Sequence, residues 1–203
     1  MITELMRLLH EGSWFRLPYD GSLYQLQIVD APGVVLQSGV LAFQDVNYLR
    51  SGPLDECRID LVEGEWSMRI ARLESEWSPS YAVACIVGRF EDAETWEPVS
   101  GEPPSFQTDQ AIIGVYDAPL RERLKRRFLG EDASFYAMIG QASETGSSRV
   151  DEAGHALMSV FTCGPGAGRY DVWRGIGGTG EPVCAVVDME ALPDYEPVRK
   201  SGP

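Results

Sequence analysis

The stretch "ALMSVFTCGPGAGRYDVWRGIGGTGEPVCAVVD", residues 156–188, decides how the fold is interpreted. Two glycine-rich segments, 163–168 and 177–181, divide it into three runs of strand-like residues. Glycine reaches positive φ without steric cost, so segments of this kind are typical of tight turns between strands. We therefore predict three antiparallel strands joined in a meander, with the glycines at the two corners.

The glycines of the first corner also raise the question of a phosphate-binding loop. Such loops present successive backbone N–H groups at the start of a helix, and in nucleotide hydrolases a Lys and a Ser or Thr follow. Here a strand-like run follows Gly168, no Gly-Lys-Ser/Thr sequence occurs, and Asp171 stands where a dinucleotide motif has its third small residue. The pattern therefore favours a turn over a nucleotide site.

The middle run, 169–176, carries two aromatic residues that are candidates for binding. Successive side chains of a strand point to opposite faces, so Tyr170 and Trp173 lie on different faces. One of them then belongs to the core, and the other lines a shallow surface. The candidate binding residues are Tyr170 and Trp173, with Gly166 and Gly168 of the adjoining turn.

The rest of the chain repeats this alternation of apolar runs and turn-forming residues. We expect a mainly β, or β-rich α+β, fold: an antiparallel sandwich or partly open barrel of about nine strands in a single domain, 1–203. Segments 88–109 and 142–155 are expected to be long connections. The runs expected to hold the strands are 23–30, 33–45, 57–74, 80–91, 110–118, 134–142, 156–164, 169–177 and 182–189.

Two helices are expected beside the strands. Residues 2–10 place apolar side chains near helical spacing and predict a short N-terminal helix. The second helix, near 118–129, has Asp117 as a candidate cap, Pro119 in its first turn and Gly130 after its end.

Composition narrows the class of protein. The chain has 203 residues, 44% of them hydrophobic, which is enough for a sizeable core, and a formal net charge of −14. No run approaches eighteen consecutive apolar residues, and residues 1–12 include charges where a signal peptide is apolar. We therefore expect a cytoplasmic protein without membrane contact. The four cysteines, which form no Cys-x-x-Cys pair, are expected to be free and mostly buried.

The negative charge repels nucleic acid and favours a basic protein partner. The exception is "RERLKRRF", residues 121–128. Residues 117–130 contain five positive and two negative side chains, so they carry a net charge of +3 and the rest of the chain carries −17. We expect this helix to dock on the protein's own acidic surface rather than on nucleic acid. The exposed aromatic residues leave a dimer open.

Residues suited to catalysis are few. His10 and His155 form no zinc-ligand spacing, and no Gly-x-Ser-x-Gly motif occurs. Asp109, Asp117 and Asp188 are expected at strand ends, where two carboxylates can act as an acid and base pair or bind Mg²⁺ or Ca²⁺. The candidate catalytic residues are these three aspartates and His155. No metal site and no cofactor are predicted.

Six segments in a fixed order resemble an uncharacterised bacterial family of domains of unknown function. That family carries V-D-x-G followed shortly by Asp, then G-D-G-x-Y-P-V-Y, then a V-x-D-F-like strand. Here Ala111 stands for the glycine, Ala167 for the acid, Asp171 for the proline and Met189 for the phenylalanine. The resemblance implies the order of the strands and no activity, and Ala167 argues against metal binding by that loop. The segments are "SGVLAFQD" (38–45), "GEWSMRI" (64–70), "YAVACIVGRF" (81–90), "TDQAIIGVYDA" (108–118), "GAGRYDVW" (166–173) and "PVCAVVDM" (182–189).

Beside a role as a stable domain in an assembly, the sequence leaves two functions open and does not decide whether the protein is an enzyme. The first is an interaction protein whose acidic surface and aromatic-lined turns bind a basic partner, for example by neutralising a basic toxin. The second is a hydrolase that uses clustered carboxylates, with or without a divalent cation.

Overall fold

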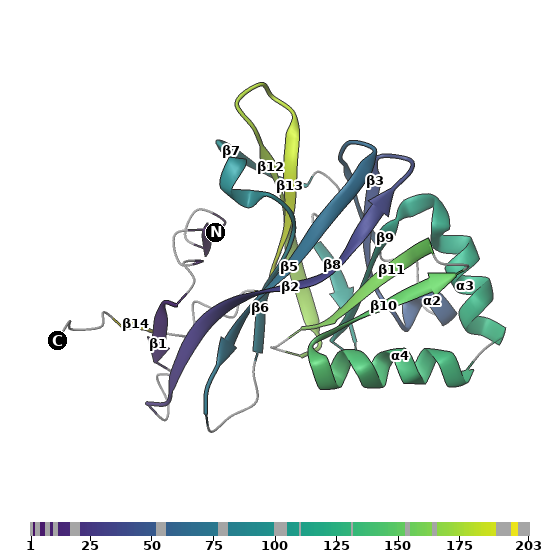
Figure 1. The fold of residues 1–203 in the computed structure, drawn as a ribbon, viewed down its shortest axis with the longest axis horizontal. Coiled ribbons are helices and arrows are strands. Elements are labelled where there is room, and N and C mark those ends of the chain that lie inside the picture. The colour runs from purple at the N-terminus through teal and green to yellow at the C-terminus, as the bar shows by residue number, and fades with distance from the viewer. Residues whose placement is uncertain are drawn as a thin grey trace.

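The computed structural model describes most of the chain as two antiparallel β-sheets that pack face to face, with helices on the outer face of one sheet (Figure 1). The residues described are 2, 5, 6, 9, 12–16, 21–51, 56–76, 81–99, 105–109, 111–130, 132–152, 155–163, 166–189 and 196–198.

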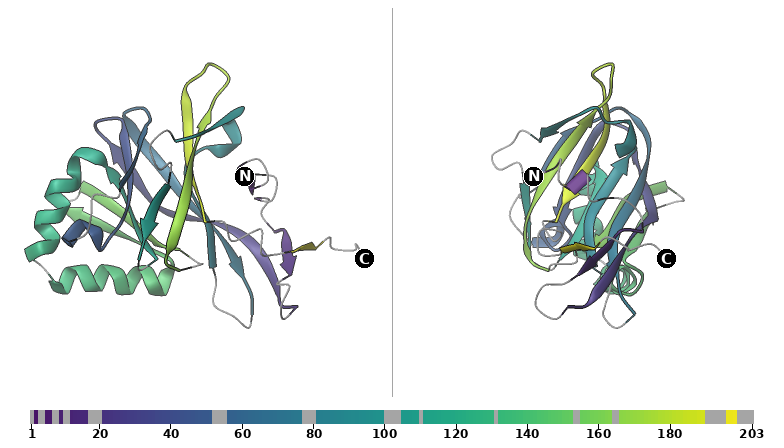
Figure 2. Two further views of the ribbon diagram at one scale, coloured as in Figure 1. Left: turned by 180° about the vertical axis from the view of Figure 1, so that it is seen from behind. Right: turned by 90° about the vertical axis from the view of Figure 1, so that its left-hand side faces the viewer.

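The larger sheet, which we call sheet A, is curled and open (Figure 2). Its strand order is β14-β1-β2-β5-β6-β13-β12-β7, and β8 also pairs with β12. Strands β2 and β5 are long and pair from end to end. The bounds are β1 (Trp14–Arg16), β2 (Leu23–Leu36), β5 (Gly64–Glu74), β6 (Tyr81–Gly88), β7 (Thr95–Pro98), β8 (Ser105–Thr108), β12 (Gly168–Ile176), β13 (Pro182–Asp188) and β14 (Glu196–Val198).

The smaller sheet, sheet B, has the strand order β10-β11-β9-β3-β4. It begins where the chain leaves β2 through a tight turn and enters β3, so the two sheets are covalently joined at this corner. The bounds are β3 (Val40–Asp45), β4 (Glu56–Asp60), β9 (Ile112–Asp117), β10 (Ser147–Glu152) and β11 (His155–Thr162).

The main core lies between the two sheets. Alternate residues of each strand point into it, as expected where two half-buried sheets pack together. Phe43 of β3 stacks on Phe106 of β8, with ring centroids 6.2 Å apart, and so ties one sheet to the other. We call the face of sheet A that meets sheet B its inner face.

Helices cover the outer face of sheet B. They are α2 (Tyr48–Ser51), the 3₁₀ turn η2 (Ala118–Leu120), α3 (Arg121–Gly130) and α4 (Asp132–Thr145). Leu124 and Phe128 of α3 face the sheet, and Phe128 packs edge-on against Phe135 of α4 at 5.2 Å between ring centroids. This contact fixes the corner between the two helices.

The outer face of sheet A carries a third apolar cluster, which includes Ile2, Leu5 and Leu9. Ile2, Leu5 and Met6 have helical backbone, and the Leu9 N–H donates to the Leu5 carbonyl at 2.9 Å. The other residues of the predicted helix 2–10 lie outside the described part. The 3₁₀ turn η1 (Phe90–Asp92) packs on the same face.

The mainly β class is confirmed, and the helix predicted near 118–129 is present as η2 followed by α3. The described residues hold fourteen strands, more than the sequence suggests. The long run 57–74 divides into β4 and β5, and the segment 88–109, predicted as a connection, contributes β7 and β8.

The prediction of a strand at 134–142 is wrong, because these residues lie in α4. Phe135, Met138 and Ala142 are buried at intervals of three and four residues, which is the helical period. A short apolar run does not by itself distinguish a helix from a buried strand. The segment 142–155 is likewise not an irregular connection, since it holds the end of α4 and all of β10.

The meander predicted around the glycine-rich corners is half correct. Strands β12 and β13 pair as an antiparallel hairpin, but β11 pairs with β9 and β10 and belongs to sheet B. The first corner therefore carries the chain from one sheet to the other. Gly166 has a φ of 101°, which favours glycine, and a strand rather than a helix begins at Gly168, as predicted.

Candidate functional site

Sheet B covers only part of the inner face of sheet A. Val29 and Ala31 of β2 pack against the core that the two sheets share. Nearer the start of β2, alternation places Leu23, Gln25 and Gln27 on the same face, but none of them belongs to that core. Figure 1 shows this end of sheet A, with β1 and β14, lying on the left, away from sheet B. We call this uncovered part of the inner face the open half.

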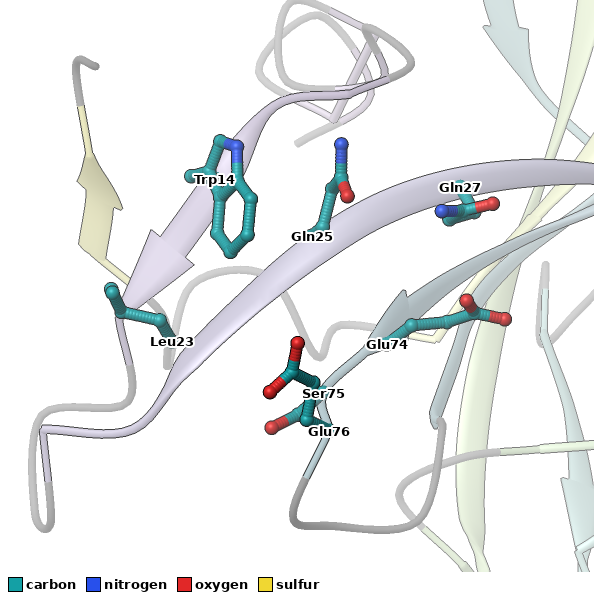
Figure 3. A pocket seen from close by; sticks show the side chains of 7 residues that line it. All are labelled: Trp14, Leu23, Gln25, Gln27, Glu74, Ser75 and Glu76. Atoms are coloured by element: carbon teal, nitrogen blue, oxygen red, sulfur yellow. The ribbon is translucent and has the colours of Figure 1, made fainter.

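A groove of about 600 Å³ lies on the open half (Figure 3). Three neighbouring strands form it: Trp14 of β1 lies directly opposite Gln25 of β2, and Gln25 lies opposite Glu74 of β5. We call it the Trp14 groove. Its lining residues are Trp14, Leu23, Gln25, Gln27, Glu74, Ser75 and Glu76.

The lining of the Trp14 groove contains two carboxylates and no cation. Glu74 is held by Arg72 of the same strand, at 2.5 Å between Nη2 and Oε1. Glu76 is exposed and forms no ion pair with any residue that the structure describes. The groove therefore offers one carboxylate in a fixed position and a second that is available to a ligand.

The other lining residues add an aromatic ring, an apolar rim and two carboxamides. Leu23 is 45% exposed, although it is a large apolar residue. The face of an indole attracts an ammonium or guanidinium group within about 6 Å. Carboxylates strengthen such a contact by charge-assisted hydrogen bonds, and carboxamides both donate to and accept from a peptide backbone. This set of groups suits a peptide segment that carries Lys or Arg.

Asp117 occupies the N-cap position of η2, as predicted, but its side chain makes no cap hydrogen bond there and holds a turn of the backbone instead. Its buried carboxylate accepts hydrogen bonds from the Gln37 N–H at 3.1 Å, from the Ser38 N–H at 3.3 Å and from the Ser38 hydroxyl. These bonds fix the corner where β2 of sheet A leads to β3 of sheet B. Pro119 in the following turn has no N–H, so a side-chain cap at Asp117 would have one backbone donor fewer to accept a hydrogen bond from.

Asp109 lies at the surface beyond β8, next to a buried carboxylate that the sequence analysis did not single out. The carboxylate of Asp45 accepts from the Thr108 hydroxyl and the Asp109 N–H, each at 2.7 Å. It also accepts from the Asn47 N–H at 2.7 Å. Asp45 thereby links the end of β3 to the end of β8, which is a structural role.

The candidate aspartates are not brought together. Asp45, beside Asp109, lies opposite Ile113 at one end of β9, and Asp117 lies at the other end, about 13 Å away along the strand. Asp188 lies in the other sheet, at the end of β13. Among the described residues, no group of three or more His, Cys, Asp or Glu side chains is placed to hold a metal ion.

His155 and Asp188 lie in different sheets. His155 begins β11 opposite Glu152 of β10, and its side chain lies outside the described part. Asp188 is buried and lies opposite Asp171 of β12. The described geometry therefore assembles no acid and base pair from the four candidate residues.

Tyr170 is the aromatic residue of β12 that belongs to the core. It packs edge-on against Phe106, with ring centroids 6.3 Å apart, and its hydroxyl donates to the Gly166 carbonyl. Burial raises the pKa of the Tyr170 hydroxyl, so the group stays protonated. Tyr170, Gly166 and Gly168 thus hold the corner between the sheets together.

Trp173 faces the outer side of sheet A. It is half-buried and packs against the apolar cluster that includes Phe90 and Trp96. Its indole N–H is buried and has no hydrogen-bond partner among the residues that the structure describes. The ring therefore contributes packing to the outer face, away from the Trp14 groove.

The four cysteines are free and buried, as predicted. Burial raises the pKa of Cys184 to about 12, and burial also raises the pKa values of Cys85 and Cys163. A thiol that stays protonated is a poor nucleophile. These cysteines therefore suit packing rather than catalysis.

Comparisons with protein-family models, with curated proteins and with solved structures find no significant match to this chain. Within the part of the chain that the structure describes, no helix is both long and apolar enough to cross a membrane.

Sequence reasoning missed the Trp14 groove, although one signal was present. The run "LYQLQ", 23–27, alternates between buried and more accessible residues, and its polar positions lie on the face that carries the groove. The sequence places Trp14, Gln25 and Glu74 far apart along the chain, so only the strand order shows that they are neighbours.

Proposed function

We propose that the protein binds a basic partner and that the Trp14 groove holds a Lys or Arg side chain of that partner. The observation that carries the proposal is one hollow of about 600 Å³ that an indole ring, two carboxylates and two carboxamides all line. A cation in this hollow gains both a cation–π contact and charge-assisted hydrogen bonds.

The charge of the whole chain supports the same proposal. A net charge of −14 attracts a cationic partner, and added salt shortens the range of this attraction. We therefore expect binding to be tightest at low ionic strength and to weaken as salt is added. A basic toxin is one partner of this chemistry.

The proposal places the protein in the cytoplasm. Free, buried cysteines are typical of a reducing compartment, where disulfides rarely persist. A basic partner in the same compartment would reach the groove directly.

The test is the binding of a fluorescein-labelled, arginine-rich peptide, followed by anisotropy at low salt. The groove-blocked variant, Glu74→Lys with Glu76→Lys, reverses both carboxylates of the groove. The control variant, Glu63→Lys with Glu65→Lys, makes the same change in net charge at the other end of β5. That end also has a tryptophan, Trp66, beside its acidic residues, so the control matches the composition of the groove.

We expect the groove-blocked variant to bind the peptide about tenfold more weakly than the wild type. The variant loses the attraction of two carboxylates for the peptide and gains the repulsion of two lysines. The control is expected to change affinity by about twofold, through the long-range field alone. Equal losses in the two variants, or no binding by the wild type, would contradict the proposal.

A further inference from the structure

A corner of the helical layer presents side chains that complement the Trp14 groove. Leu129 of α3 and Tyr136 of α4 are 58% and 62% exposed, although both are large and largely apolar. Lys125 and Arg126 precede Leu129 on α3 by about one helical turn, which places them beside it. Tyr136 lies near the start of α4, where its ring packs edge-on against Phe135 and lies 5.9 Å from the Arg50 guanidinium. We call Lys125, Arg126, Leu129 and Tyr136 the helix corner.

The cations of the helix corner differ from the other cations of α3. Arg123 forms an ion pair with β10 of the same chain, and Arg127 donates to a carbonyl of β10 at 2.8 Å. These contacts confirm that α3 docks on the protein's own acidic surface. Lys125 and Arg126, in contrast, form no ion pair with any described residue, although the Arg126 Nε–H donates to the Glu122 carbonyl of the same helix at 3.2 Å. The helix corner therefore keeps positive charge for another molecule.

The groove and the helix corner lie at opposite ends of the molecule. Figure 1, which has the longest axis horizontal, shows β1 on the left and α3 on the right, and the reverse view in Figure 2 agrees. One copy of the chain cannot bring its own helix corner into its own groove. Two copies placed head to tail can.

Resting on the proposed function, we infer that the basic partner in the Trp14 groove is the helix corner of a second copy of this chain. The cations of the corner meet the carboxylates of the groove. The exposed apolar side chains cover one another, which removes Leu23, Leu129 and Tyr136 from water. Charge and apolar surface are therefore complementary at this local contact. The net charge of −14 on each copy repels the other copy over longer distances, so self-association, unlike the binding of a basic peptide, should strengthen as salt screens that repulsion.

The symmetry of this contact has a clear consequence. Two different surfaces meet, so the contact is heterologous, and each added copy leaves one free groove and one free helix corner. Association then continues with concentration and does not stop at a dimer.

The experiment measures mass in solution, by sedimentation velocity, for the wild type and two variants. The groove-blocked variant is Glu74→Lys with Glu76→Lys, and the corner-blocked variant is Arg126→Glu with Leu129→Ser. Glu76, Arg126 and Leu129 are exposed, whereas Glu74 is half-buried, so thermal unfolding verifies that each variant is folded. We expect the average mass of the wild type to rise with concentration, and each variant alone to stay at 22.4 kDa.

Mixing the two variants gives the sharpest result. An equimolar mixture contains one intact groove and one intact helix corner per pair, so it should reach twice 22.4 kDa and stop there. A wild type that remains monomeric up to about 1 mM would overturn the inference, because the dissociation constant of the contact would then lie above about 1 mM, too weak for a specific contact. Association of either variant alone would also overturn it.

The peptide assay separates this inference from the proposed function. The corner-blocked variant has an intact groove and is expected to bind the arginine-rich peptide as tightly as the wild type does. Peptide binding together with a monomeric wild type would overturn self-association and leave the groove as a site for another basic partner. Self-association without peptide binding would overturn the proposed function.

Discussion

The covered and open halves of the inner face of sheet A differ along single strands. On β5, Met68 and Ile70 are buried against sheet B, whereas Glu74, on the same face, lines the Trp14 groove. Strand β2 changes in the same way, from Val29 in the covered half to Gln25 in the open half. Both halves share one backbone geometry and one alternation.

The difference shows what each half does. Where sheet B supplies a cover, the inner face is apolar, because burial removes those side chains from water. Where there is no cover, the face is polar, as solubility requires, except for Trp14 and Leu23. These two side chains form the apolar part of the open half, and both line the groove proposed as the binding site.

The largest effect is expected in the covered half. Phe43→Ala removes a fully buried ring and should lower the free energy of unfolding by about 3–5 kcal/mol. Trp14→Ala, in the open half, should lower it by about 1 kcal/mol or less, because the ring is only half-buried. Urea unfolding measures both changes, and similar losses would break the distinction between the two halves.

The next effect concerns the corner that places sheet B over sheet A. Asp117→Ala leaves the N–H groups of Gln37 and Ser38 without their acceptor and should cost about 1–3 kcal/mol of stability. Asp109→Ala, at an exposed position, should cost less than about 0.5 kcal/mol. The same unfolding assay compares them. A larger loss of stability for Asp109→Ala than for Asp117→Ala would contradict the structural role assigned to Asp117.

A smaller and opposite effect is expected where the chain crosses from β8 of sheet A to β9 of sheet B. Ala111 has a φ of 58°, a conformation that costs an L-residue about 1–2 kcal/mol. Ala111→Gly should therefore raise the melting temperature, with a net gain of about 0.5–1 kcal/mol after the entropy of glycine is subtracted.

Ala137→Gly, on an exposed turn of α4, is the matched control for this change. It should lower stability by about 1 kcal/mol, as glycine does within helices. A loss at Ala111 as large as the loss at Ala137 would show that the backbone at Ala111 is not strained.

The smallest effect concerns the ion pair between Arg69, which lies over the Phe90 ring, and the half-exposed Glu91. A hydrogen bond from Arg69, at 2.7 Å, holds the pKa of Glu91 below its usual range. A lowered carboxyl pKa stabilises the fold above the pKa of the unfolded state, and this contribution is lost as pH falls through the folded pKa. Because both side chains are partly exposed, the contribution should be about 0.5 kcal/mol or less.

Glu91→Gln measures that contribution through the pH dependence of urea unfolding. The difference between wild type and variant should be constant from neutral pH down to the ordinary carboxyl pKa, and it should vanish at about pH 2. A difference that grows as pH falls would have the wrong sign for this pair.

Local patterns were enough to predict the class of fold and one helix. Period-two alternation predicts most strands, and Pro119 in the first turn together with Gly130 after the end predicts the helix near 118–129. The same kind of evidence failed for α4, because a run of apolar and aromatic residues fits both a buried strand and a helix. Its buried positions, Phe135, Met138 and Ala142, resolve the ambiguity only when their three- and four-residue spacing is weighed.

Pairings between distant segments could not be predicted from such patterns. A glycine-rich sequence is typical both of a turn that closes a hairpin and of a turn that carries the chain between sheets. The pattern therefore predicts a hairpin where the chain in fact crosses from β11 in one sheet to β12 in the other. The Trp14 groove was missed for the same reason. Its three central residues come from strands that become neighbours only through the order β1-β2-β5.

The most direct test of the open half is to map the binding of the arginine-rich peptide by amide chemical shifts. The corner-blocked variant is the protein to use, because its mass stays constant during the titration. We predict that the largest shifts fall on the indole N–H of Trp14 and on the amides of Gln25, Glu74 and Glu76. Largest shifts at Trp66 instead, at the other end of β5, would contradict the assignment of the groove as the binding surface.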